Sequence, residues 1–158
     1  MLEYKQGNLL ESEAEALVNA VNCMGVMGKG IALQFKQAYP GNFEHYAAAC
    51  AAGEMAPGRM LAVPVDTDSA SRWIINFPTK RHWRGKSKLE DIRNGLAGLT
   101  ETLRQHGIRS VAVPALGCGL GGLDWEVVKP LIETAAAELP EVRFEVYLPA
   151  GITESAGK

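Results

Sequence analysis

The residue types most able to do chemistry in this chain are concentrated in one short basic segment, residues 80–88. It reads Lys-Arg-His-Trp-Arg-Gly-Lys-Ser-Lys, with five basic residues and no acidic one. Cations neutralise the phosphates of a single-stranded nucleic acid and an aromatic ring stacks on its bases, so this composition is typical of a strand-binding surface. The candidate nucleic-acid contacts are Arg81, His82, Trp83, Arg84, Lys86 and Lys88. A solvated surface loop is the alternative, because runs of charge are common on protein surfaces.

Lys80 differs from the other cations because it follows an expected strand at 73–77 after only Pro78 and Thr79. A lysine that is partly desolvated beside other cations can act as a nucleophile or as a proton donor. Lys80 is therefore the candidate catalytic residue. His82 is a second candidate proton carrier, because histidine exchanges protons readily near neutral pH.

The first of two glycine-rich stretches, residues 22–32, lies between an apolar run and an expected helix. Glycine lets the backbone approach a ligand, and a helix N-terminus offers free N–H groups to an anion. It is not a Walker loop, because Lys29 is followed by Gly30 where that motif requires Ser or Thr. A tight turn with glycine at positive φ, capped by Asn22, is the structural alternative.

In the second stretch, residues 114–122, Gly117, Gly119 and Gly122 match the G-x-G-x-x-G pattern. A dinucleotide-dependent oxidoreductase is disfavoured, because the motif lies near the C-terminus and no acid ends the next strand. Two such loops instead suggest a diphosphate held between two backbone nests, although a purely structural loop is also consistent with the pattern. Cys118 has no adjoining base, so we expect a small side chain in a tight loop and not a nucleophile.

These segments must be positioned by alternating strands and helices. The apolar patterns predict strands at 2–6, 16–21, 60–65, 73–77, 110–114 and 142–148, and helices at 31–39, 43–52, 89–106 and 124–139. We expect Pro40 and Gly41 to end the first helix, and Pro130 to kink or restart the last one. Such alternation predicts an α/β fold with a mostly parallel sheet covered on both faces. The ligand then lies outside the carboxyl ends of the strands.

Composition sets the remaining limits. The chain has 158 residues, which suits one domain, here placed at 1–149 with a flexible tail or linker at 150–158. A net charge of −2 means that any nucleic acid must be met by a local basic patch. Three scattered cysteines and the lack of metal-ligand spacing predict no disulfide framework, no metal and no cofactor. No apolar run reaches the roughly 18 residues of a membrane-spanning helix and no leader pattern is evident, so we expect a cytoplasmic protein that does not enter a membrane.

Several of these motifs, taken in order, resemble the macrodomain family. The similarity rests on Gly7-Asn8-Leu9, on residues 18–22, on the glycine-rich helix entry and on residues 114–119, and it spans nearly all of residues 1–149. Residues 28–35 together with Lys80 are similar to the lysine-dependent branch that contains DNA ADP-ribosyl glycohydrolase antitoxins. The resemblance implies a three-layer α/β/α sandwich with a mixed, mostly parallel sheet.

The resemblance also implies a site for ADP-ribose at the sheet edge. Asn8 and Leu9 would lie near the adenine with Tyr147 and Leu148 on its other side, and Lys80 would act at the anomeric carbon of the distal ribose. The implied ligand contacts are Asn8, Leu9, Asn22, Gly28, Gly30, Ile31, Ala32, Thr79, Leu116, Gly117, Cys118, Gly119, Leu120, Gly121, Tyr147 and Leu148. The implied substrate is ADP-ribose on thymine bases of single-stranded DNA, placed there by a DarT-type toxin.

Two other functions are compatible with the same motifs. Macrodomains include non-catalytic readers of ADP-ribose, which need the glycine-rich loops but no lysine at the ribose. They also include hydrolases of protein-linked ADP-ribose. A relative of that kind carries Asp where this chain has Gly121, and the family often has Asp where this chain has Asn8.

Overall fold

The computed structural model describes residues 1–66 and 71–153, so residues 154–158 of the expected tail lie outside the described part. The strands are β1 (Leu2–Lys5), β2 (Ala16–Val21), β3 (Leu61–Asp66), β4 (Ser71–Pro78), β5 (Ser110–Val113) and β6 (Arg143–Tyr147). The helices are α1 (Gly30–Ala38), α2 (Pro40–Ala51), α3 (Leu89–Gln105) and α4 (Trp125–Ala137). Two short 3₁₀ turns, η1 (Leu9–Glu11) and η2 (Gly119–Gly121), were not expected from the sequence.

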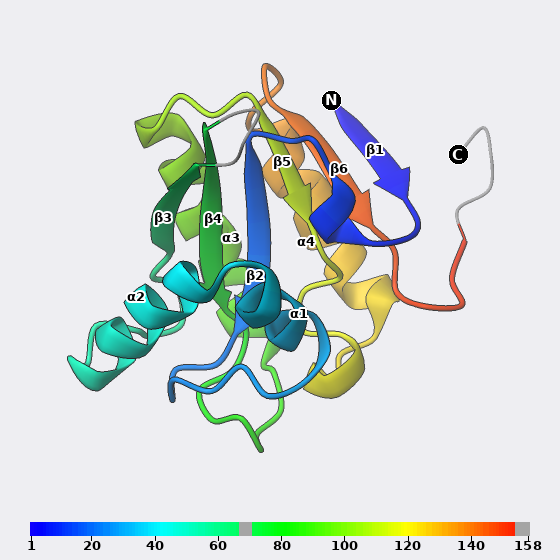
Figure 1. Cartoon of the computed structure of the whole chain (residues 1–158). Coiled ribbons are helices and arrows are strands. Elements are labelled where there is room, and N and C mark those ends of the chain that lie inside the picture. The colour runs from blue at the N-terminus through cyan, green and yellow to red at the C-terminus, as the bar shows by residue number, and fades with distance from the viewer. Residues whose placement is uncertain (67–70, 154–158) are drawn as a thin grey trace.

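The strands form one sheet in the order β1-β6-β5-β2-β4-β3. All neighbouring pairs are parallel except β3 and β4, so the predicted mixed, mostly parallel sheet is confirmed. Five strands therefore point the same way, and the segments that follow them emerge at one edge, the lower edge in Figure 1. This edge is where a parallel sheet of this kind presents its ligand site.

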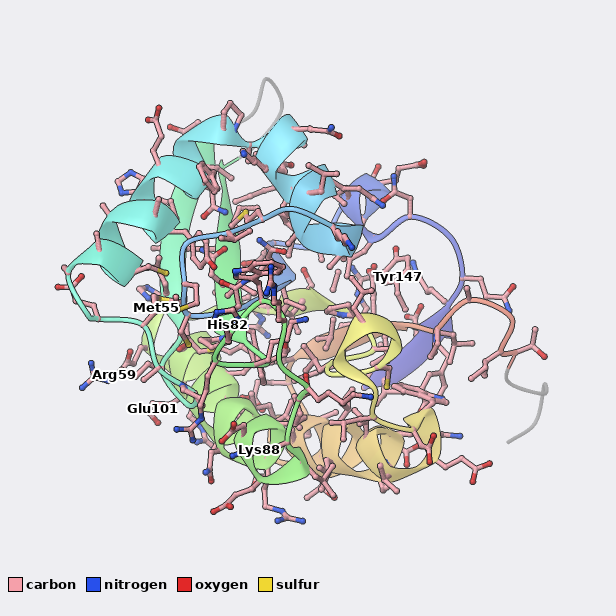
Figure 2. The ribbon with its side chains drawn as sticks, turned by 90° about the horizontal axis from the view of Figure 1, so that it is seen from below. Met55, Arg59, His82, Lys88, Glu101 and Tyr147 are labelled. Atoms are coloured by element: carbon pink, nitrogen blue, oxygen red, sulfur yellow. The ribbon has the colours of Figure 1, made fainter. Side chains whose placement is uncertain are left out.

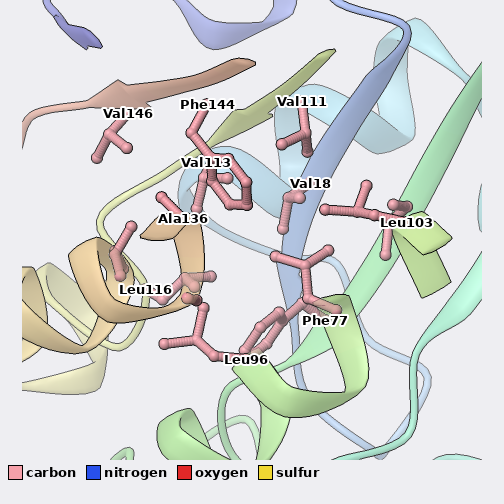
Figure 3. Close-up of a cluster of buried hydrophobic side chains, with 14 of the residues drawn as sticks. Val18, Phe77, Leu96, Leu103, Val111, Val113, Leu116, Ala136, Phe144 and Val146 are labelled. Carbon is pink, nitrogen blue, oxygen red and sulfur yellow. The ribbon is translucent and has the colours of Figure 1, made fainter. Parts of the chain in front are cut away.

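Helices α3 and α4 cover one face of the sheet. Leu96 of α3 and Ala136 of α4 pack with Val18, Phe77 and Val113 of three strands in the largest buried cluster (Figure 3). These strands are buried on both faces, which explains why their sequences are nearly continuous apolar runs and do not alternate with polar residues.

Helices α1 and α2 cover the other face, which completes the predicted three-layer sandwich. Phe35 of α1 packs on Leu17 and Ile74 of the sheet. Tyr46 of α2 packs with Val21 and Met27, where β2 enters the first glycine-rich loop. The two helices lie toward the edge that carries the loops (Figure 1).

The two internal prolines differ in effect. Pro40 ends α1 as expected, but α2 begins at Pro40 itself, because the first residue of a helix needs no N–H donor. The restart expected at Pro130 is wrong, since α4 runs unbroken from Trp125 to Ala137. Pro130 costs one helical hydrogen bond, and the burial of Val128 and Ile132 on the sheet outweighs that loss.

Candidate active site

The basic segment, residues 80–88, lies with the preceding Thr79 between the two glycine-rich loops at the carboxyl edge of the sheet. At its start the Thr79 N–H donates to the Val21 carbonyl oxygen at 2.8 Å, and the Cys23 N–H donates to the Arg81 carbonyl oxygen at 3.1 Å. At its end the Ser87 N–H donates to the carbonyl oxygen of Gly121 at 2.9 Å. The view from below shows the segment crossing this edge, with His82 near its middle (Figure 2).

Lys80 is half-buried directly after β4. Its Nζ donates to the carbonyl oxygen of Trp83 at 3.0 Å, within the same segment. It forms no ion pair with any residue that the structure describes. The ammonium is therefore held in place by a neutral acceptor that leaves its charge uncompensated.

The remaining side chains of the basic segment are partly engaged with one another. The guanidinium of Arg84 lies 4.4 Å from the centre of the Trp83 ring, and the rings of His82 and Trp83 stack with centroids 5.5 Å apart. The Arg84 N–H donates to His82 Nδ1 at 3.1 Å. Trp83 stays 42% exposed, so the expected aromatic surface is present, but it belongs to a self-stacked group and is not a free ring.

The exposed cations of the segment fall into two kinds. Arg81 pairs with Asp91 of α3, with Nη2 and Oδ1 3.4 Å apart and the carboxylate buried. Arg84, Lys86 and Lys88 are exposed and form no ion pair within the described part of the chain. These three are the cations best placed to meet a phosphate backbone.

Asn22 closes the first glycine-rich loop. Its Oδ1 accepts from the Met24 N–H at 2.9 Å and from the Tyr46 hydroxyl at 2.8 Å, while its Nδ2 donates to the Val26 carbonyl oxygen at 2.8 Å. The turn-capping alternative therefore describes what Asn22 does in this structure. A contact between Asn22 and a ribose stays a prediction.

The N-terminus of α1 faces the same edge. Lys29 occupies the N-cap position without a side-chain cap, and Gly30 has φ +61°, so the first N–H groups of the helix have no side-chain acceptor. A Cβ on Gly30 would stand 3.4 Å from Leu120 Cδ1 of η2. The two glycine-rich loops are thus brought together, as two nests around one diphosphate require. Gly28, Ile31 and Ala32 lie along the same loop and the first turn of α1.

The glycines of the second loop have different roles. Gly117 has φ +76°, and a Cβ there would stand 2.7 Å from Leu123 Cδ1, so packing alone explains its identity. Gly119 has φ +63° and nothing within 4 Å of a Cβ position, which leaves its backbone open to approach. Leu120 is 63% exposed, whereas Leu116 is fully buried, backbone included, so a contact between Leu116 and a ligand stays a prediction.

The thiol of Cys118 is half-buried in this loop. Burial, with a smaller contribution from Asp124, raises its pKa to about 11. A thiol with a raised pKa is protonated and weakly nucleophilic at neutral pH. This agrees with the expectation that Cys118 is a small loop side chain.

The residues expected at the adenine lie together where β1 and β6 end. Leu9 and Tyr147 are buried in one apolar cluster, against which Ile31 also packs. Asn8 is exposed, and its Oδ1 accepts from the Leu10 N–H at 3.0 Å, which caps η1. The Leu148 N–H donates to the Lys5 carbonyl oxygen at 2.9 Å.

Sequence reasoning missed the polar groups that support these loops. Asn76 Oδ1 accepts from Asn42 Nδ2 at 3.1 Å and from Asn19 Nδ2 at 3.3 Å, all fully buried. This network joins α2, β2 and β4 just before the site. Asn19 and Asn76 interrupt the apolar runs of two expected strands, which is a signal for buried polar groups, but nothing in the sequence indicates that they meet Asn42 of α2. Ser87 and Tyr46 escaped notice for the same reason.

Two hollows of the surface lie away from this edge. One, of about 200 Å³, is lined by Leu103, Arg109 and Val142 among others. The other, of about 320 Å³, lies between the α1–α2 junction and β3. Among the described residues there is no group of three potential metal ligands and no helix long and apolar enough to cross a membrane.

Comparison with known proteins gives consistent matches. The Macro domain family matches residues 18–132. A DNA ADP-ribosyl glycohydrolase of Mycobacterium tuberculosis is 51% identical over 151 residues, which are 96% of this chain and 43% of that protein. One of Thermus aquaticus is 46% identical over 149 residues, covering 94% of this chain and 41% of that protein. The chain therefore spans less than half the length of these relatives.

Solved structures agree with the sequence matches. The macrodomain of Mycobacterium tuberculosis DarG superposes with a TM-score of 0.93 at 51% identity, covering 95% of this chain and 99% of that one. Thermosipho africanus DarTG in complex with ADP-ribose superposes with a TM-score of 0.90 at 35% identity, covering 98% of this chain and 43% of that one. With its fold, its two glycine-rich loops and these similarities, the chain belongs to the macrodomain family.

Proposed function

We propose that this macrodomain is a DNA ADP-ribosyl glycohydrolase that removes ADP-ribose from thymine bases of single-stranded DNA. In this role it would reverse the action of a DarT-type toxin and serve as the antitoxin. The relatives at 46–51% identity bear that enzyme name, and the similar DarTG structure holds ADP-ribose. The observation that carries the proposal is Lys80, placed between two glycine-rich loops on an exposed basic segment.

The loops account for ligand binding. The uncapped N-terminus of α1 and the open backbone at Gly119 supply N–H groups to the diphosphate, and the helix dipole favours its negative charge. The adenosine end would lie beside Asn8, Leu9, Tyr147 and Leu148. Thr79 precedes Lys80 in the chain, and its N–H donates to Val21, the residue before Asn22. Thr79 and Asn22 would therefore lie on the side of the distal ribose. Binding of this kind needs no metal or other cofactor.

Hydrolysis breaks the bond between C1″ of the distal ribose and a thymine ring nitrogen. Water adds a hydroxyl group to C1″, and the base leaves with a proton. Positive charge develops on the ribose and negative charge on the base, so the Lys80 ammonium can protonate or stabilise the base. A neutral Lys80 amine can instead attack C1″ and form a covalent intermediate. Both mechanisms require the amine beside the anomeric carbon.

The basic segment accounts for a DNA substrate. Arg84, Lys86 and Lys88 can bind phosphates, and the Trp83 group offers a stacking surface. A reader of ADP-ribose would need none of these residues. The absence of a carboxylate at Gly121 separates the chain from the relative that acts on protein-linked ADP-ribose. We place the activity in the cytoplasm, where a reducing environment suits three free cysteines.

The experiment that tests this function compares two substrates. One is a single-stranded oligonucleotide that carries ADP-ribosyl-thymidine, and the other is a protein that carries ADP-ribose on acidic side chains. We expect release of ADP-ribose from the oligonucleotide and little from the protein. Binding of ADP-ribose without release from either substrate would identify a reader instead, and faster release from the protein would identify the other hydrolase.

A further inference from the structure

Ser87 of the basic segment and Gly121 of η2 occupy adjoining space. Their backbones are joined by the hydrogen bond from the Ser87 N–H to the Gly121 carbonyl oxygen, 2.9 Å long. Ser87 is only 7% exposed, and its buried Oγ has no hydrogen-bond partner among the described residues. A Cβ on Gly121 would overlap that Oγ and stand 3.1 Å from Ser87 Cβ. A side chain at position 121 therefore competes with the side chain of Ser87.

The backbone does not explain why position 121 is glycine. Gly117, Gly119 and Gly122 all have φ between +63° and +83°, which disfavours other residues. Gly121 is not among the glycines with positive φ, so any residue type could adopt its backbone conformation. The glycine is needed there because Ser87 fills the space that a side chain would take.

This contact fixes the far end of the segment that carries Lys80. The near end is attached to β2 and the first loop through Thr79 and Arg81. Between the two ends, the Gly85 N–H donates to the His82 carbonyl oxygen at 2.9 Å, and Lys80 Nζ donates a hydrogen bond to the Trp83 carbonyl oxygen. These hydrogen bonds connect the segment from end to end, so a displacement of Ser87 should also displace Lys80.

We propose that Ser87 and Gly121 form a positioning pair that docks the basic segment on the second glycine-rich loop and thereby places Lys80 at the bound ribose. The proposal rests on the proposed function, because it assigns Lys80 the reaction. In this pair Ser87 acts through the volume of its side chain, which fills the space that a Cβ at position 121 would take.

The first test is the Gly121→Ala variant. Its new Cβ enters the volume of Ser87 and displaces the segment, and a misplacement of about 1 Å at a reacting group costs on the order of 10²-fold in rate. We expect a loss of that size in single-turnover release of ADP-ribose from modified single-stranded DNA. The affinity for free ADP-ribose, measured by calorimetry, falls by much less, because free ADP-ribose does not need Lys80 in place.

The second test is rescue at Ser87. In the Gly121→Ala background, Ser87→Ala removes the overlapping Oγ but keeps Ser87 Cβ at 3.1 Å, so rescue is partial. Ser87→Gly removes both side-chain atoms. The backbone nitrogen of residue 87 then lies 4.0 Å from the new Cβ at position 121, which is an ordinary contact distance. The Gly121→Ala/Ser87→Gly variant should then match the rate of Ser87→Gly alone. A folded double variant that is much slower than Ser87→Gly alone overturns the proposal.

Gly119→Ala in the same loop is the matched control. It introduces strain at φ +63° but meets no atom within 4 Å, so Ser87→Gly should not rescue it. Rescue of both variants would mean that Ser87→Gly acts through general loosening, which also contradicts the proposal. Thermal unfolding of the same variants gives a readout independent of activity. If the wild type releases nothing from DNA, the proposed function fails, while the melting temperatures still decide whether the two residues are paired.

Discussion

The charge of Lys80 is uncompensated because its Nζ is bonded to a backbone carbonyl oxygen and not to a carboxylate. An ion-pair partner would neutralise the ammonium before the substrate arrived. The neighbouring Arg81 shows the contrast, since its guanidinium is paired with the buried carboxylate of Asp91. Lys80, which is hydrogen-bonded to a neutral acceptor, is thus available for the reaction, whereas Arg81, which is paired with Asp91, has a structural role.

The thiol of Cys118 gives a prediction of pH dependence at the same scale. Its pKa is raised to about 11 because burial disfavours the charged form. Alkylation by iodoacetamide, followed at Cys118 by mass spectrometry, should therefore rise with a midpoint near pH 11 in the folded protein. In the unfolded chain the midpoint should lie at about 8.5, the value of a free thiol. A folded midpoint below that of the unfolded chain would mean that the loop stabilises the thiolate.

At the scale of elements, α3 holds the end of β4 that leads to Lys80. A Cβ on Gly95 of α3 would overlap the ring of Phe77, which is fully buried in β4. Glycine is a poor helix former, so its presence in mid-helix reflects this close approach. The helix and strand approach each other so closely here that one methyl group on Gly95 has no room.

The Gly95→Ala variant should therefore lower the free energy of unfolding. Overpacking a core costs about 1–3 kcal/mol, while the gain in helix propensity returns about 1 kcal/mol. The difference is a net loss of up to about 2 kcal/mol in denaturant unfolding, and we expect the upper end because the overlap is with a fully buried ring. Gly41→Ala in α2 is the control, because nothing lies within 4 Å of a Cβ at that position. Equal stability of both variants would contradict the packing argument.

The elements themselves were largely predictable from the sequence. The buried parallel strands have continuous apolar sequences, and α3 has one apolar face with Gly107 after it, so these patterns indicated their positions. The restart at Pro130 was predicted wrongly because local propensity takes no account of the burial of α4 on the sheet. The η1 and η2 turns are too short to leave a periodic pattern.

The candidate site was predictable as a set of segments and not as a set of contacts. Strand polarity brings loops from distant parts of the chain to one edge, and glycine content identified them. The contacts of Asn22 with Tyr46 and of Ser87 with Gly121 are set by packing between α2, η2 and the loops, which lie far apart in sequence. Spacing along the chain carries no information about such contacts.

At the scale of the whole molecule, a net charge of −2 is combined with one exposed basic segment. A generally acidic protein binds DNA only where its cations are concentrated, so the segment should determine the approach of the strand. Arg59 lies apart from the segment, at the connection between α2 and β3 (Figure 2). Arg59 therefore serves as a control position outside the basic segment.

Charge reversal of Arg84 and Lys88 should weaken both the activity on modified DNA and its dependence on salt. Each phosphate contact on a single strand contributes about 0.7 to the slope of log affinity against log salt, so two lost contacts lower it by about 1.4. Binding of modified DNA is measured across a salt series. Reversal of Arg59 and Arg109, both exposed and away from the segment, should leave the slope unchanged. An unchanged slope in the segment variant would make the segment a solvated loop.

The most direct test of the account is single-turnover release of ADP-ribose from modified single-stranded DNA by the wild type and by Lys80→Ala. The loops that hold the ligand use backbone groups, so the variant should bind ADP-ribose normally in calorimetry. Its rate of release should fall by at least about 10²-fold, the low end for a positioned acid–base group. A borohydride-trapped adduct in the wild type alone would favour nucleophilic attack by Lys80 over acid catalysis. Release by Lys80→Ala at the wild-type rate would contradict the account.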